Sequence, residues 1–267
     1  MLICTRVAQR APPSSDGAAG WQSAAGLEET EYLRRAAEVQ KLELFMNSMD
    51  NPEHLSDFPN LVELAIHLES MPRAVGLSRM WQLQRLCMTE TGLKSLKGIE
   101  ACTSLTHLDC SHNKLTEIDG AVLRHLPKIR TMWLNDNAIS RMGGLESLSC
   151  LTSLWLGSNR IPAVGDALTN NHALEDLNLA GNLVCNFKDI PTLARMRSLR
   201  TLAFGEPHFG DNPVCSLCNY QTCAPARVAA LRWHAACVMP RASRCSLRMP
   251  RLPMTNDSIF FTGRLNS

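Results

Sequence analysis

The segment Leu151-Thr-Ser-Leu-Trp-Leu-Gly-Ser-Asn-Arg-Ile161 decides the fold of this chain, because its pattern recurs along the sequence. Copies begin at seven positions, at spacings of 22, 22, 24, 22, 23 and 25 residues: Leu61, Leu83, Leu105, Ile129, Leu151, Leu174 and Leu199. Apolar residues return at the first, fourth, sixth and eleventh places of the pattern. Such regular spacing indicates a repeat protein rather than a globular domain around one central core.

The alternation within each copy predicts a short strand, with the leucines pointing inward and the intervening side chains pointing outward. A period of 20–29 residues with leucine at these places is typical of leucine-rich repeats. We therefore predict an α/β leucine-rich repeat solenoid. Its curved parallel β-sheet should form the concave face, and short helical or 3-10 turns should form the convex face.

The ninth place of the pattern is an Asn in four successive copies: Asn113, Asn137, Asn159 and Asn182. Each stands where the chain turns out of a strand, so its amide is able to bond backbone groups that have lost a sheet partner. We predict a structural Asn ladder rather than a catalytic group. The first, second and last repeats carry Glu69, Thr91 and Pro207 at this place, as atypical terminal repeats would.

The rest of the chain divides by composition into flanking segments. Residues 1–22 are rich in Ala, Ser, Pro and Gly and are predicted to be disordered. An N-terminal capping helix is expected within 23–57, mainly over 27–49, because apolar residues recur there at helical spacing. The seven repeats and a cap fill 58–223. A basic, poorly ordered tail follows over 224–267, with at most a short helix near 227–237.

Charge and cysteine content bound the possible classes. The tail contains seven Arg and one Asp, whereas residues 1–223 have 20 basic and 24 acidic side chains. No apolar run reaches the ~20 residues needed to span a bilayer, and the N-terminus lacks the apolar region of a secretory signal. Its basic start leaves an organelle transit peptide as an alternative. The 11 cysteines mostly occupy single repeat positions, so we expect reduced thiols in the cytoplasm, with no membrane partner.

The repeat register identifies the side chains that should face outward on the concave sheet. Trp133 and Trp155 take equivalent places on adjacent strands, about 4.8 Å apart in backbone spacing. Trp is frequent in binding hot spots, and polar or charged side chains would surround the pair. We predict a protein partner site made of Trp133, Trp155, Asp109, Asp136, Asp176, Asn178, His107 and Arg85.

Other constellations are weaker. Cys215, Cys218 and Cys223 have a C-x₂-C-x₄-C spacing, which suits zinc, although a fourth ligand is not evident. The Arg-rich tail could contact nucleic acid, but its arginines are spread out and are not interleaved with aromatic residues, so nucleic acid is an unlikely partner. His107, Asp109 and His112 have no nucleophile with an orienting partner, so we expect neither an enzyme nor a cofactor.

Several motifs resemble a known family. The string Asn212-Pro-Val-Cys-Ser-Leu-Cys-Asn-Tyr220 and the Asn178-Leu-Ala-Gly-Asn182 segment are similar to the N-terminal repeat block of the leucine-rich repeat-containing protein 9 family. Leu42-Glu-Leu-Phe45, ahead of Phe58-Pro-Asn-Leu61, is similar to the segment that leads into that family's first repeat. The resemblance spans about residues 40–223, and the sequence from Ala224 onward departs from it.

The resemblance implies a non-enzymatic, cytoplasmic repeat protein that could be associated with a cilium or flagellum. Repeats of this 22-residue type are shared with the regulatory subunit of protein phosphatase 1 and with flagellar repeat proteins. The partner implied is therefore a protein such as a phosphatase catalytic subunit or an axonemal component.

Overall fold

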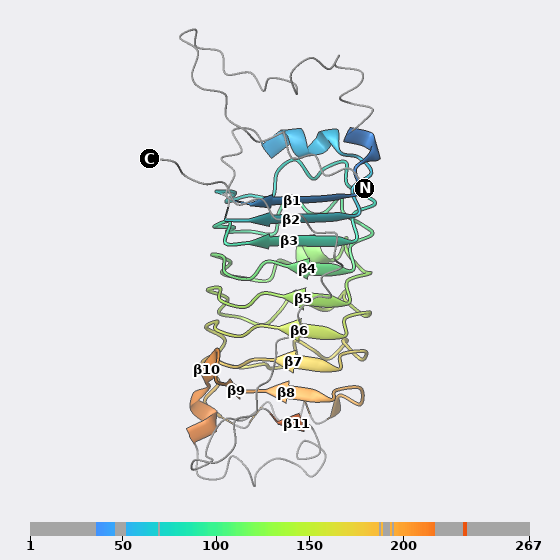
Figure 1. The fold of residues 1–267 in the computed structure, drawn as a ribbon. Coiled ribbons are helices and arrows are strands. Elements are labelled where there is room, and N and C mark those ends of the chain that lie inside the picture. Colours follow the sequence, from blue (N-terminus) through green and yellow to red (C-terminus); the bar gives the residue numbers. More distant parts are fainter. Residues whose placement is uncertain are drawn as a thin grey trace, which may run out of the picture.

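A computed structural model describes residues 36–45, 52–68, 70–186, 188, 193, 195–216 and 232–233. These residues form a solenoid whose strands pair in parallel and in chain order, except for a small antiparallel hairpin of β9 (Gly205–Glu206) and β10 (Gly210–Asp211) (Figure 1). The large sheet consists of β1 (Lys41–Phe45), β2 (Glu63–His67), β3 (Arg85–Thr89), β4 (His107–Asp109), β5 (Thr131–Trp133), β6 (Ser153–Trp155), β7 (Asp176–Asn178), β8 (Thr201–Ala203) and β11 (Arg232–Trp233). The predicted leucine-rich repeat solenoid is confirmed.

The convex side has little regular structure. Only α2 (Gly120–Leu123) is an α-helix of at least four residues in the described ranges, and short turns make most of the returns. Two 3-10 helices, η1 (Pro52–Asp57) and η2 (Pro213–Ser216), lie near the two ends of the solenoid. None of the described helices is long and apolar enough to cross a bilayer.

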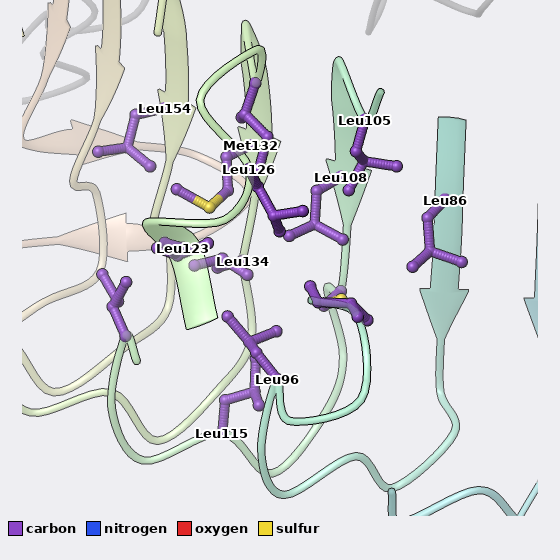
Figure 2. Close-up of a cluster of buried hydrophobic side chains, with 14 of the residues drawn as sticks. Leu86, Leu96, Leu105, Leu108, Leu115, Leu123, Leu126, Met132, Leu134 and Leu154 are labelled. Atoms are coloured by element: carbon purple, nitrogen blue, oxygen red, sulfur yellow. The ribbon is translucent and has the colours of Figure 1, made fainter. Parts of the chain in front are cut away.

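The core lies between the sheet and the convex turns and runs the length of the solenoid. Figure 2 shows its middle, where Leu108 and Met132 from adjacent strands belong to one buried cluster with Leu96, Leu115 and Leu126 from the returning chain. All five are at most 1% exposed. Each strand presents its middle residue to this core because successive side chains of a strand point to opposite faces. The outward residues of the strands are thus left for the concave face.

Asparagine side chains connect successive turns along one edge of the sheet. The Nδ2 of Asn159 donates to the carbonyls of Leu134, Leu156 and Gly157 at 2.9–3.2 Å, and its Oδ1 accepts from the Ile139 amide at 3.0 Å. Equivalent bonds surround the other members of this ladder: Asn113, Asn137 and Asn182. Each amide therefore satisfies backbone groups from two neighbouring repeats.

A further ladder member is Asn212, which the sequence pattern missed. Its Nδ2 donates to Leu179 O at 2.6 Å and Phe204 O at 2.7 Å, and its Oδ1 accepts from Val184 N at 2.9 Å. Assigning Pro207 to this place is wrong, because the chain between Phe204 and Asn212 loops out as the β9–β10 hairpin, Gly205–Glu206 with Gly210–Asp211. The amide at residue 212 then returns to the position that the repeat requires.

The predicted N-terminal helix agrees with the structure at residues 36–38 and is wrong at Lys41–Phe45. Residues 36–38 are helical, but β1 follows at once and pairs in register with β2. Leu42 and Leu44 are buried while Glu43 is exposed, an alternation that a helix would not give. Val39, Leu42 and Leu44 repeat the pattern of Leu61 exactly one 22-residue period earlier, so the sheet starts one repeat before the predicted boundary at residue 58.

The C-terminal segment is described only at β11, which pairs in parallel with β8. A short helix around 227–237 is therefore wrong at Arg232–Trp233, because a sheet edge offers backbone partners that a strand takes up. The remainder of the predicted tail lies outside the described residues, as does the disordered segment predicted over residues 1–22.

Candidate partner-binding face

Two rows of outward side chains cross the concave face, one residue from each strand. The upstream row runs through the strand starts: Lys41, Glu63, Arg85, His107, Thr131, Ser153, Asp176 and Thr201. The central row lies two residues further along each strand: Glu43, Ala65, Cys87, Asp109, Trp133, Trp155, Asn178 and Ala203. The parallel register therefore gives, for each predicted site residue on a strand, the residue that lies beside it on the adjacent strand.

Trp133 and Trp155 are adjacent in the central row. Their ring centroids are 5.7 Å apart and the ring planes are tilted by 38°. Both side chains are partly buried rather than fully exposed, because each covers part of the other. Tilted rings at this separation attract each other, so the pair forms one continuous aromatic surface on β5 and β6.

The two indoles differ in how their N–H groups are held. Trp155 Nε1 donates to Asp176 Oδ2 at 2.7 Å, and the same oxygen accepts from Ser153 Oγ at 3.3 Å. Trp133 Nε1 is buried and has no acceptor among the described residues. A buried N–H without an acceptor is unfavourable by about 1–3 kcal/mol. Within the described residues, a hydrogen bond thus fixes the Trp155 ring but not the Trp133 ring.

Asp109 precedes Trp133 in the central row and follows Cys87. Its Oδ1 accepts from the Ser111 amide at 2.9 Å, and its Oδ2 accepts from Cys87 Sγ at 3.8 Å. Both donors are neutral, so they fix the direction of the carboxylate without cancelling its charge. Asp109 therefore presents a negative charge beside the aromatic surface.

Asp136 lies just beyond the end of β5, at the rim of the concave face. It has a left-handed backbone conformation with φ 51°, and His112 occupies the same position one repeat earlier with φ 57°. Asn and Asp tolerate this conformation better than most residues with a side chain. His112 Nδ1 and Asp136 Oδ2 lie 3.4 Å apart, so the rim holds a polar pair close to the tryptophans.

Arg85 and His107 belong to the upstream row and do not contact the tryptophan pair directly. Arg85 Nε lies 3.5 Å from Glu63 Oε1, and Lys41 Nζ lies 3.6 Å from Glu63 Oε2. Burial and the nearby Arg85 charge lower the pKa of His107. The first strands thus carry charges that are already paired with one another.

Asn178 was predicted as an exposed part of the site, and the structure shows it buried at 5% exposure. Its Nδ2 donates to Glu206 Oε2 at 2.7 Å, and its Oδ1 accepts from the Ala180 amide at 2.9 Å. Ala203, its neighbour in the central row, is also buried, at 3%. The prediction of Asn178 as a contact residue is wrong because the chain after β8 folds back over it.

The chain that folds back after β8 packs closely against two glycines. A Cβ on Gly157 would lie 2.7 Å from the Phe209 ring, and a Cβ on Gly181 would lie 2.1 Å from the Phe209 carbonyl oxygen. Gly181 has φ +66°, the left-handed conformation that Ser158 adopts at the same position of the preceding repeat. The hairpin therefore depends on small residues that periodicity alone did not single out.

Cys87, the one cysteine in the central row, does not provide a nucleophile. Burial, followed by the Asp109 charge, raises the pKa of the Cys87 thiol far above its ordinary value, so the thiolate is not available. Cys215 is buried, and its Sγ donates to Phe204 O at 3.4 Å. Cys218 and Cys223 lie outside the described residues, and no potential metal cluster of His, Cys, Asp or Glu occurs within the described ranges.

Comparison with known proteins supports the repeats directly. Residues 103–161 match a family model described as leucine rich repeat. The chain is 32% identical over 226 residues to leucine-rich repeat-containing protein 23 from Bos taurus, covering 77% of this chain and 64% of that protein. It is also 29% identical over 138 residues to a homolog of a protein phosphatase 1 regulatory inhibitor subunit from Arabidopsis thaliana, covering 49% and 42%.

Some similarities cover only a small part of the other protein. The match to geranylgeranyl transferase type-2 subunit alpha from Bos taurus is 40% identical over 95 residues, which is 35% of this chain and 17% of that protein. The chain spans about a fifth of the length of the curated relatives matched in this way. Such a partial match gives no ground for assigning a transferase activity to this chain.

Solved structures agree on the fold. An internalin C2 from Listeria monocytogenes aligns with a TM-score of 0.59 at 20% identity, over 72% of this chain and 80% of that chain. An internalin from the same species aligns with a TM-score of 0.58 at 18% identity, over 76% and 62%. The resemblance to the leucine-rich repeat-containing protein 9 family stays a prediction. The shared fold and the matched repeat model establish that the chain contains leucine-rich repeats.

Proposed function

We propose that the chain is a non-enzymatic scaffold that binds a protein partner on its concave face. The observation that carries this proposal is the aromatic surface of Trp133 and Trp155, which lies on the outward side of β5 and β6. The core does not need these rings, because Met132 and Leu154 already fill the inward positions of the same strands. Large aromatic side chains that are not used by the core are typical of binding hot spots.

The proposal is tested by quantitative affinity capture with the full chain. Replacing Trp133 and Trp155 together by Ala should weaken the affinity for captured partners by about 30-fold or more, which corresponds to a hot-spot effect above 2 kcal/mol. Trp81→Ala is the matched control, because Trp81 is 60% exposed and lies in a turn outside the strands. Retention of all partners by a folded double variant would place the binding site elsewhere.

A narrower candidate is a regulatory subunit of a protein phosphatase. It is supported by the similarity to the Arabidopsis thaliana phosphatase regulatory subunit homolog over about half of this chain. Mixing the purified chain with the catalytic subunit of protein phosphatase 1 should give a complex on size-exclusion chromatography and altered phosphatase activity. Separate elution with unchanged activity would exclude this role while leaving the general scaffold intact.

The remaining functional alternatives stay predictions. The zinc-stabilised and nucleic-acid-contacting modules depend on Cys218, Cys223 and most of the 224–267 tail, which lie outside the described residues. Association with an axonemal component and a cytoplasmic or ciliary location likewise stay predictions. None of these alternatives is needed for the concave-face proposal.

A further inference from the structure

The carboxylates beside the tryptophan pair differ from the other charges of the concave strands. Lys41, Glu63 and Arg85 form ion pairs with one another on the first strands. Asp109 lies on β4 and Asp176 on β7, the strands on either side of the two tryptophan strands. Neither carboxylate makes an ion pair with another described residue. The chain therefore neutralises its own charges at one end of the face and leaves two negative charges next to the aromatic surface.

The geometry at Asp109 leaves room for a cationic partner group. Its two neutral donors, the Ser111 amide and the Cys87 thiol, occupy one position on each carboxylate oxygen. A carboxylate accepts about four hydrogen bonds in all, and its strongest partners are cations. Cys87 stays a neutral thiol in this setting, so it neither adds to nor cancels the charge of Asp109.

The neighbouring ring selects among cations. Indole faces attract cations, and a planar guanidinium both stacks on the ring and forks onto a carboxylate, which a lysine ammonium does not do. Trp133 Nε1 lacks an acceptor in the described chain, and a peptide main-chain carbonyl would supply one after a small rotation of the ring. Trp155 does not need such an acceptor, because Asp176 already accepts its N–H.

We propose that this surface binds an arginine side chain of an extended protein segment, with the guanidinium stacked on Trp133 and paired with Asp109. This inference deepens the proposed scaffold function and rests on it. Phosphate-bearing ligands such as nucleic acids are disfavoured, because Asp109, Asp136 and Asp176 would repel them. The arginine therefore belongs to a protein rather than accompanying a polyanion.

The probe is the peptide acetyl-Gly-Gly-Arg-Gly-Gly-amide, added to the ¹⁵N-labelled full chain. The indole N–H signals of Trp133 and Trp155 should shift in a saturable way, whereas the Trp81 signal should not. Replacing the arginine by citrulline, which keeps the shape and removes the charge, should weaken binding about tenfold, equivalent to ~1.4 kcal/mol. A lysine peptide should bind about threefold more weakly than the arginine peptide.

Variants of the chain locate the contact. Asp109→Asn keeps an oxygen for the Ser111 amide and should weaken arginine-peptide binding about tenfold. Asp166→Asn is the matched control, because Asp166 is exposed on the convex side, and it should leave binding unchanged. Trp133→Phe keeps a ring and should weaken binding about threefold, since phenyl attracts cations less than indole. Equal binding of citrulline and arginine peptides, or an unaffected Asp109→Asn variant, would overturn the proposal.

The same variants separate this inference from the broader function. If captured partners depend on Trp133 and Trp155 but not on Asp109, then the concave face binds proteins without using an arginine. If captured partners depend on neither tryptophan, then the proposed scaffold site itself is wrong. Circular dichroism and urea unfolding of each variant should match the wild type, so that loss of binding is not loss of folding.

Discussion

The strands β5–β6 and β7–β8 present the same two rows in the same register, yet only one pair is open. Trp133 and Trp155 remain partly exposed in the central row, whereas Asn178 and Ala203 are 5% and 3% exposed. Glu206 of the following hairpin explains part of this difference, because it accepts a hydrogen bond from Asn178. An outward position on a strand therefore fixes only the direction of the side chain. Whether a partner reaches the side chain depends on what a later loop covers.

The closed region also shows how a repeat tolerates an insertion. The ladder amide of Asn212 reaches back to Phe204 O, eight residues earlier, whereas Asn182 reaches Leu179 O only three residues earlier. The extra residues form a hairpin outside the repeat and pack against the preceding repeats. The core and ladder are thus continuous through both regions, and the difference is confined to the outer face.

The largest expected effect tests this continuity of the core. Leu154 lies beneath the open region and Leu177 beneath the closed one, and both are 0% exposed. Leu154→Ala and Leu177→Ala should each lower the free energy of unfolding by about 2–5 kcal/mol, measured in urea. Similar losses are expected because the two layers are equally buried. A loss at only one of them would show that the two regions differ in their cores as well.

The next effect concerns the seat of the hairpin. Gly181→Ala would place a Cβ 2.1 Å from Phe209 O, whereas Gly165→Ala meets nothing within 4 Å. Both glycines have left-handed φ values, +66° and +57°, so both variants carry the same backbone strain. Gly181→Ala should therefore be about 1–3 kcal/mol less stable than Gly165→Ala in urea unfolding. Equal stability would mean that the hairpin does not rest on Gly181.

A smaller effect is expected from the hydrogen bond that joins Asn178 to the hairpin. Asn178→Asp should lower the free energy of unfolding by about 1–2 kcal/mol at pH 7, because a carboxylate then faces Glu206 and the amide donor is lost. The loss should shrink below about pH 4, where carboxylates become protonated. Glu206→Gln added to this variant should restore most of the stability at pH 7, and failure to do so would argue against direct contact.

The smallest expected effect is a pH dependence of stability that comes from His67 on β2. His67 stacks on Phe45 with centroids 4.5 Å apart and bonds Thr89, and burial lowers the pKa of His67. The charges of Asp109, Glu43 and Glu90 oppose that shift. Because the pKa in the folded state lies below the unfolded value of about 6.5, the unfolded chain binds the extra proton. Stability should thus be full above the unfolded pKa and fall as the pH drops through it towards the folded pKa.

His67→Gln provides the measurement for that pH dependence. Between pH 7.5 and pH 5, the free energy of unfolding in urea should change less with pH for the variant than for the wild type. The difference should be smaller than the three effects above, since the ring is only partly buried. A wild-type profile with the same slope as the variant would contradict a contribution from His67.

Much of the candidate face was predictable from the sequence. The alternation in Met132-Trp133-Leu134 and Leu154-Trp155-Leu156 is local, so it places both tryptophans on the outer face of adjacent strands. The strand β1 was missed because the same residues fit both a strand period and a helical period. Val39, Leu42 and Leu44 satisfy the strand period, while the wider helical spacing around them suggested a helix. Docking against β2 favours the strand, because a partner edge supplies backbone hydrogen bonds.

The period of the solenoid, the inward leucines and the outward position of Trp133 and Trp155 follow from the amino-acid sequence alone. These features follow from side-chain alternation, which acts between near neighbours in the chain. Three features required the three-dimensional structure: Asp176 fixes Trp155, the Trp133 N–H has no acceptor among the described residues, and Asn178 is covered. Those contacts join residues from different repeats, and their geometry depends on how the chain returns rather than on any local pattern.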